Sequence, residues 1–425
     1  MFTGIKRTSI ILIILGLLLL QQGCASPKDI ARPEKVVSKR EAVYEKEVYV
    51  EWAQRCKEYY DVFPSEDAYA NWMYAARYAE QENYEELLMK GVKKYPANPT
   101  LLYLAGLLKH GAVGDFEGQR YFERSIELDP TYNDPWFGLV GIYMERRDED
   151  KLNNALRRLL KGAAIAEEVM DYNYNVLTTL DRNAILITNG DNDTYPCWVL
   201  QRILNYRTDV TIVNRSLMNT EWYPGYLMEQ GLPRFMTQEE IEEFRDRRLA
   251  AMKESGKPPV YSEMGDSLVV YLTNYAAKFG RPVYFALTLY DSEILDPLKS
   301  EGVMLGLAIR VTESDKPYSE EAAVVMRQWL SDYRSAGLDS WKVQFASASS
   351  AGRWIVSNYA YAMVSTLDTL KANAPAMRRE LFEWYTKHLE KVIPLQHRER
   401  VEQYWCSQSD VPEIQEWCRK AGIGK

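Results

Sequence analysis

Histidine and cysteine are scarce in this sequence. Its 425 residues include three histidines (His110, His388 and His397) and five cysteines. None of them are spaced as Cys-x-x-Cys, His-x-x-x-His or His-Glu-x-x-His. A zinc site made of cysteine and histidine therefore has few residues to be built from.

Dense runs of basic residues are also absent. Lysine and arginine total 52 against 60 acidic residues, and the formal net charge is −8. This balance argues against a nucleic acid partner, because binding to phosphates needs a concentrated basic surface. The sequence also lacks a Gly-x-Ser-x-Gly nucleophile elbow, a Gly-x-x-x-x-Gly-Lys phosphate loop and a Gly-x-Gly-x-x-Gly turn after a strand.

The one long apolar run lies at the N-terminus. Two basic residues precede the run Ile10–Leu20, which is short for a permanent membrane span. Gly23 and Cys24 follow, and this stretch resembles the lipobox of bacterial lipoproteins. We therefore predict a cleaved signal peptide over residues 1–23 and lipidation of Cys24. The alternative is plain secretion with an incidental cysteine.

Lipidation would place the mature chain in the bacterial cell envelope, in contact with the membrane only through its anchor. Ala25 gives no inner-membrane retention signal of the Asp type, which favours the outer membrane. Residues 24–44, rich in charge and proline, are predicted to be a tether. An oxidising envelope allows a Cys406–Cys418 disulfide, and two free buried thiols are the alternative.

A helical pattern with a repeat fills residues 45–170. Tyr95-Pro96 and Asp129-Pro130 end successive predicted helices 34 residues apart, and the same offset separates Leu102 from Trp136. Over roughly residues 66–168 the pattern resembles tetratricopeptide repeats. Stacked repeats of this kind leave a concave surface, so the expected partner is an envelope protein or peptide. The alternative is that the repeats only pack against the next domain.

Residues 178–315 alternate short apolar runs with helical patterns. This alternation predicts an α/β domain with a Rossmann-like, mainly parallel sheet. A highly charged helix, Thr237–Ser255, is predicted on its rim. The expected strands are Ala184–Thr188, Val210–Val213, Val283–Leu289 and Met304–Val311, and the expected covering helices are Thr194–Tyr206 and Ser262–Phe279.

An acidic loop, Gly190-Asp191-Asn192-Asp193-Thr194, follows the first predicted strand. Ligands of open α/β sheets bind at this edge. Asp191 and Asp193 could hold Mg²⁺ through oxygen, and the helix that follows could accept a phosphate at its N-terminus. The alternative is structural, because Asp193 is a natural helix cap and Pro196 suits a first helical turn.

The same region resembles a known family. The stretch Ile185–Trp198, the residues Asn214, Asn219 and Trp222, and later Arg353 with Asn358-Tyr359 match its pattern. The family is the glycosyltransferase-like DUF2723 type of bacterial membrane proteins, related to protein O-mannosyltransferases. The resemblance covers roughly residues 180–390 and corresponds to the soluble C-terminal part of that family.

The resemblance implies a soluble module rather than sugar transfer. The chemistry of the family is expected in a multi-span membrane region, in whose place this chain has helical repeats and a lipid anchor. What carries over is the expectation that polar residues cluster at the sheet edge. These candidate ligand-binding residues are Asp191, Asn192, Asp193, Thr194, Asn214, Asn219 and Trp222.

Residues 316–425 are again helical, and we predict hairpins there, with long helices over Ser350–Ala372 and Pro375–Val392. The fold class expected for the chain is thus α/β plus all-α. We predict a non-catalytic, lipid-anchored interaction scaffold for surface-glycan or envelope assembly, which requires no cofactor. The alternative is a sugar-phosphate-binding or metal-binding enzyme that uses Mg²⁺ at Asp191 and Asp193.

Overall fold

The computed structural model describes residues 30–109, 116–254, 262–314, 316–369, 375–408 and 411–423. The predicted signal peptide and Cys24 lie outside these residues. Within them, none of the helices combines the length and apolar character that a membrane span requires. The described residues form two compact units: the first contains residues 30–37 and 45–104, and the second contains residues 38–44 and the described residues from 105 to 423.

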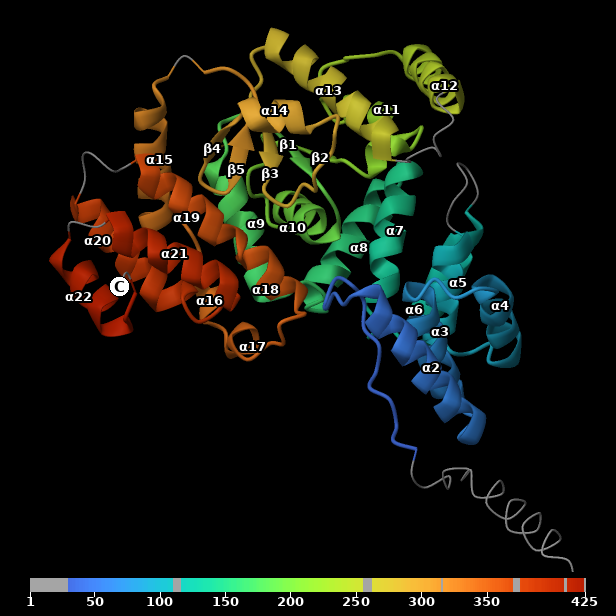
Figure 1. Cartoon of the computed structure of the whole chain (residues 1–425). Coiled ribbons are helices and arrows are strands. Elements are labelled where there is room, and N and C mark those ends of the chain that lie inside the picture. The colour runs from blue at the N-terminus through green and yellow to red at the C-terminus, as the bar shows by residue number, and fades with distance from the viewer. Residues whose placement is uncertain are drawn as a thin grey trace, which may run out of the picture. The chain divides into compact units, whose positions relative to one another are not determined.

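The first unit is built from three helices and the start of a fourth (Figure 1). Ser65 caps the second of them by accepting a hydrogen bond from the Ala68 amide at 3.2 Å. Tyr69 lies so close to Gly91 that a Cβ there would meet its ring at 2.2 Å. The absence of a side chain at Gly91 therefore allows the two helices that carry Tyr69 and Gly91 to pack closely. They are α2 (Lys46–Val62), α3 (Glu66–Tyr78), α4 (Tyr84–Lys94) and α5 (Pro99–Lys109).

The helical pattern continues in the second unit. Phe122 is fully buried, and its ring lies against both Gly106 and Gly138, where an added Cβ would come within 2.5 and 2.6 Å. Asp148 caps α8 through the Lys151 amide at 3.1 Å. The elements are α6 (Glu117–Leu128), α7 (Asp134–Glu145), α8 (Glu149–Lys161) and α9 (Glu167–Thr179).

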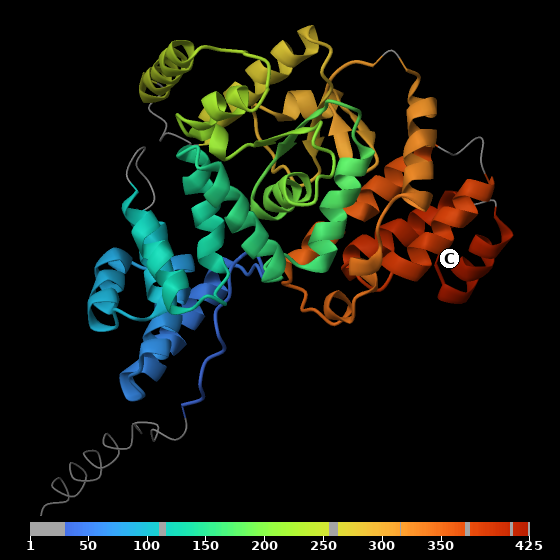
Figure 2. The same ribbon diagram turned by 180° about the vertical axis from the view of Figure 1, so that it is seen from behind.

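A five-stranded sheet forms the centre of the second unit (Figure 2), in the order β2-β1-β3-β5-β4. The central strand β1 pairs in parallel with β2 and β3, whereas β5 is antiparallel to both β3 and β4. The strands are β1 (Ile185–Thr188), β2 (Thr211–Asn214), β3 (Val283–Ala286), β4 (Val303–Leu305) and β5 (Ala308–Arg310).

The prediction of one strand over Met304–Val311 is wrong. Gly306 adopts a φ of +54° and turns the chain back on itself, so this stretch forms the hairpin β4–β5. A left-handed backbone favours glycine, and an apolar run by itself does not reveal the turn. The sheet is consequently mixed rather than mainly parallel.

Helix α13 lies at its predicted position, whereas α10 begins at Asp191, three residues before its predicted start, so the acidic residues form its first turn and not a loop. Helix α10 contacts β2, and α13 contacts β3. The charged rim helix is present as α12. The bounds are α10 (Asp191–Arg202), η1 (Leu217–Asn219), α11 (Tyr223–Glu229), α12 (Gln238–Glu254), α13 (Ser262–Lys278) and α14 (Asp296–Glu301).

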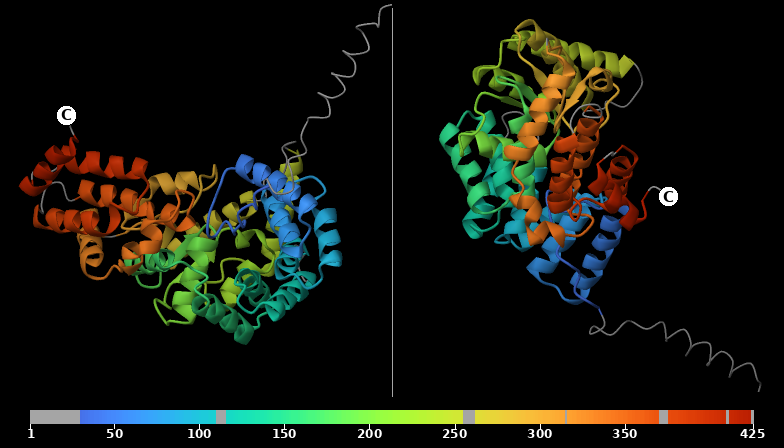
Figure 3. Two further views of the ribbon diagram at one scale, coloured as in Figure 1. Left: turned by 90° about the horizontal axis from the view of Figure 1, so that it is seen from below. Right: turned by 90° about the vertical axis from the view of Figure 1, so that its left-hand side faces the viewer.

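The C-terminal helices pack together beside α9 in the second unit (Figure 3). The long helix predicted from Ser350 is interrupted at Ser357, and the helix that begins at Pro375 ends in a π-helical turn. The elements are α15 (Tyr318–Ser331), α16 (Ala336–Asp339), α17 (Trp341–Gln344), α18 (Ala351–Val356), α19 (Asn358–Thr369), α20 (Pro375–Trp384), η2 (Tyr385–Leu389), α21 (Leu395–Gln408) and α22 (Pro412–Ala421).

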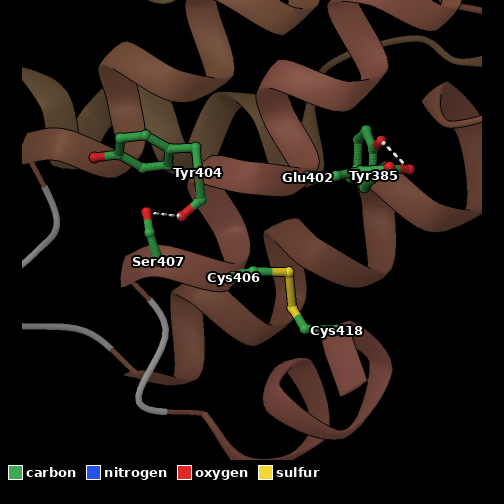
Figure 4. The surroundings of a disulfide bond; sticks show 6 residues. All are labelled: Tyr385, Glu402, Tyr404, Cys406, Ser407 and Cys418. Carbon is green, nitrogen blue, oxygen red and sulfur yellow. Dashed lines mark hydrogen bonds between the residues drawn. A yellow bond between two sulfur atoms is a disulfide. The ribbon is translucent and has the colours of Figure 1, made fainter. Parts of the chain in front are cut away.

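A disulfide between Cys406 and Cys418 joins α21 to α22 (Figure 4). Beside it, the Tyr385 hydroxyl donates to the Glu402 carboxylate at 3.4 Å. Cys56 and Cys197 are both free and buried. Of the two alternatives left by the sequence, the structure contains the disulfide.

Removing this disulfide is expected to destabilise the C-terminal helices. The bridge closes a loop with a sequence separation of 12, and bridges over short loops contribute roughly 3 kcal/mol. A Cys406→Ser/Cys418→Ser variant should unfold at lower urea concentration than the oxidised protein. Adding a reductant should lower the urea midpoint of the wild type and leave that of the variant unchanged. Equal midpoints for variant and oxidised wild type would contradict this expectation.

Glu168 is a buried carboxyl where α9 meets α18. A Cβ on Gly352 would come within 2.0 Å of the Glu168 Oε1 atom. Burial raises the pKa of Glu168 above its usual value of 4.5. Because the folded state favours the protonated form, ionisation at neutral pH opposes folding.

A Glu168→Gln variant is therefore expected to be more stable than the wild type at pH 7. Below the unfolded pKa, near 4.5, the carboxyl is protonated in both states and this gain should vanish. The gain should grow as the pH rises through the raised folded-state pKa. Urea unfolding of both proteins from pH 4 to pH 8 measures it, and a difference that does not change with pH would contradict the assignment.

Candidate functional site

The predicted site lies where β1 and β2 end. These strands are parallel, so Thr188 and Asn214 lie side by side at the same edge of the sheet. Asn189 and Gly190 follow β1, and α10 begins at Asp191. The structure thus brings the acidic loop and the end of β2 together, as the sequence predicts.

Asp193 is buried and caps its own helix. Its carboxylate accepts hydrogen bonds from the backbone amides of Asn189 and Gly190 at 2.7 and 2.8 Å. The Thr288 hydroxyl donates to the same carboxylate. Burial raises the pKa of Asp193, while these three hydrogen bonds oppose the rise. Both carboxylate oxygens are therefore used within the fold.

The Asp191 carboxylate interacts with a different part of the chain. Its carboxylate lies 3.0 Å from the guanidinium of Arg40, and the same guanidinium contacts Asp134 at 2.7 Å and lies over the Phe137 ring. The Asn192 amide donates to the Arg40 carbonyl at 3.2 Å. Asp191 and Asn192 thus fasten residues 38–44 to the start of α10.

The neighbouring polar residues form a buried network. The hydroxyls of Thr188 and Thr194 lie 2.7 Å apart, and the Asn214 amide donates to Thr194 at 2.9 Å. The Asn214 side-chain oxygen accepts from the Leu217 amide at 2.8 Å. These interactions connect β1, α10, β2 and η1, and they leave Thr194 and Asn214 buried.

Asn219 and Trp222 lie farther along the chain. The Asn219 side-chain oxygen accepts from the Gly265 amide at 2.8 Å, and its nitrogen donates to the Ser216 carbonyl. Trp222 is half-buried and lines an open pocket of about 640 Å³. The other residues that line it are Arg147, Glu221, Gly225, Met228, Glu229, Arg234, Met236 and Gln238. Of the seven predicted residues, only Trp222 lines this pocket.

The sequence prediction missed a buried ion pair at the same sheet edge. Arg215 follows β2 directly, and its Nε and Nη2 atoms lie 2.5 and 2.7 Å from the two carboxylate oxygens of Asp266 on α13. The Arg215 and Asp266 side chains are only 10% and 2% exposed. Ser292 donates a further hydrogen bond to Asp266. The position of Arg215 immediately after an apolar strand could have marked it as a residue of this edge. Its partner could not be identified from the sequence, because Asp266 lies 51 residues farther along the chain.

The edge is therefore occupied by the protein's own side chains. Among the residues that the structure describes, no group of three or more histidine, cysteine, aspartate or glutamate residues could hold a metal ion. The backbone amides of Asn189 and Gly190, which directly precede α10, have the Asp193 carboxylate as their acceptor.

Residues 169–232 match the family model of TMEM260-associated domain 2. The match runs from α9 through β1, α10 and β2 to the residues just after α11. It therefore includes all seven predicted site residues. No curated protein matches the chain.

The two aspartates of the loop should differ in their effect on stability. An Asp193→Ala variant leaves two partly buried backbone amides without this acceptor and is expected to lose about 2–3 kcal/mol of unfolding free energy. An Asp191→Ala variant removes one partly exposed ion pair and should lose less than about 1 kcal/mol. Urea unfolding measures both, and equal losses would contradict the structural role given to Asp193.

Proposed function

We propose that this protein is a lipid-anchored scaffold of the cell envelope without catalytic activity. Its helical repeats would bind a protein or peptide partner, and Cys24 would carry the lipid that holds the chain at the outer membrane. The α/β region would serve a surface-glycan or envelope-assembly system.

This proposal rests on one observation: the polar residues at the sheet edge already have partners within the protein. A metal or phosphate site needs carboxylates and amides that are free to bind a ligand. Here Asp193 accepts two backbone amides, Asp191 binds Arg40, and Arg215 pairs with Asp266. This arrangement supports a structural role for the loop over the alternative of an Mg²⁺-dependent enzyme.

The repeat assignment is supported by packing as well as by spacing. Phe122 packs between glycines on α5 and α7, and these helices begin 35 residues apart, at Pro99 and Asp134. Helix pairs that repeat at about this length are typical of tetratricopeptide arrays, whose concave surfaces bind partners.

The link to glycan assembly has separate support. The resemblance to the soluble part of the DUF2723 family begins near residue 180, and the match to TMEM260-associated domain 2 overlaps its first part. Both concern the sheet and its loops rather than a membrane region. We therefore propose a role beside such a system and not the transfer of a sugar by this chain.

Changing Cys24 tests the anchored scaffold directly. Expressed in a bacterium that processes lipoproteins, the full chain should enter the membrane fraction and incorporate labelled palmitate. A Cys24→Ala variant should lose the label and appear in the soluble fraction. A Cys56→Ala variant, altered at a buried cysteine inside the fold, serves as the control and should keep the label. Unlabelled wild-type protein would overturn the proposed anchor.

A further inference from the structure

A short extended segment lies against the helices of the first unit. Residues 30–37 form neither helix nor strand. Within the segment, Pro33 and Val36 are buried, whereas Glu34 and Lys35 are exposed. This part of the predicted tether is thus bound to the fold through two apolar side chains.

Asn71 on α3 binds the backbone of this segment. Its side-chain oxygen accepts a hydrogen bond from the Val36 amide at 2.7 Å, and its side-chain nitrogen donates to the Glu34 carbonyl at 2.8 Å. One carboxamide therefore pairs with the amide and the carbonyl that flank Lys35, as a neighbouring β-strand would. Such pairing recognises an extended backbone and does not depend on the side chain of the residue between.

The segment does not fill the space available to it. A pocket of about 470 Å³ lies beside it. Residues 32, 33, 35 and 36 of the segment line one part of this pocket, and the rest is lined by residues of α2 and α3 together with Ser65 and Thr100. Those helix residues include Cys56, Tyr59, Ala68, Ala70, Asn71 and Tyr74.

We propose that this groove is a binding site for an extended peptide and that residues 33–36 occupy it in cis. The partner it fits is an extended segment in which a proline is followed three residues later by a small β-branched residue, with its backbone paired to Asn71. The inference rests on the proposed scaffold function, since it gives the repeats a defined peptide ligand.

Occupation in cis follows from the covalent connection. A segment joined to its site acts at a high effective concentration, so a free peptide competes poorly while residues 33–36 are bound. A partner that binds here must displace residues 33–36, and displacement would free these residues from the helices of the first unit.

Peptide binding to the mature full-length chain with Cys24→Ala tests the proposal. The probe is a fluorescent peptide with the sequence of residues 30–38, followed by fluorescence anisotropy. Val36→Asp places a charge in the buried position and should expel the segment, so this variant should bind the peptide at least tenfold more tightly than the parent. Adding Asn71→Ala to that variant should weaken binding at least tenfold.

Two controls separate displacement from unfolding. Val62→Asp introduces the same charge at an exposed position on α2 and should bind no better than the parent. If Val36→Asp does not retain the melting temperature and circular dichroism of the parent, Val36→Ser replaces it. The proposal would be overturned if a folded Val36 variant binds the peptide no better than the parent does. It would also be overturned if adding Asn71→Ala does not weaken the binding. Labelling of Cys24 tests the anchored scaffold separately, so the two failures can be distinguished.

Discussion

Replacing Asp266 by asparagine is expected to lower the free energy of unfolding by about 3–5 kcal/mol, because it leaves the Arg215 guanidinium buried without its counter-ion. The guanidinium has two hydrogen bonds to that carboxylate, and its remaining contacts with Asn189 and the Tyr290 carbonyl are longer, at 3.4 and 3.3 Å. Urea unfolding followed by tryptophan fluorescence measures the loss.

Two comparisons isolate the ion pair. Replacing both partners with apolar residues, Arg215→Met/Asp266→Leu, should cost less than Asp266→Asn alone, because no unpaired charge stays buried. Asp291→Asn removes an exposed ion pair with Lys299 and should change stability little. A loss below about 1 kcal/mol for Asp266→Asn would contradict the burial of this pair.

Phe122→Ala is expected to destabilise the second unit by about 3–5 kcal/mol. The ring is fully buried and fills the space between the two glycines of α5 and α7, so its removal leaves a cavity that rigid helix backbones cannot close. Chemical denaturation measures the change, and a second variant checks its cause.

That second variant is Gly138→Ala. A methyl group there would lie 2.6 Å from the Phe122 ring and should cost about 1–3 kcal/mol through overpacking. In the Phe122→Ala background the same methyl group meets no ring, so Gly138→Ala should lower the free energy of unfolding by less than it does in the wild type. Phe279→Ala, at an exposed ring, should have little effect. Additive losses at Phe122 and Gly138 would contradict the contact.

Much of the helical fold could be predicted from the sequence, because helix boundaries carry local signals. The charged rim helix and the helix before Arg281 lie within two residues of their expected ends. The β4–β5 hairpin could not be predicted in the same way. Its turn depends on the backbone of Gly306, and its pairing with β3 depends on contacts between distant segments.

The candidate site was only partly predictable for the same reason. The loop after β1 and the end of β2 do meet at one edge, since both strands run in the same direction. What fills that edge comes from elsewhere in the chain. Arg40 binds Asp191, Thr288 donates to Asp193, and Asp266 pairs with Arg215. Sequence patterns identify polar residues at an edge, but they do not show which of them already have partners.

We infer that the protein's own side chains fill the sheet edge and leave no site there for a small ligand. Thermal unfolding of the mature chain with Cys24→Ala tests it, in the presence of Mg²⁺, Mn²⁺, Ca²⁺ or nucleotide-sugars. A ligand at a hundredfold excess over its dissociation constant would stabilise the native state by roughly 2.7 kcal/mol. No rise in melting temperature is expected with any of them. A rise that is present in this protein and lost on adding Asp191→Asn/Asp193→Asn would contradict this inference and identify the loop as a ligand site.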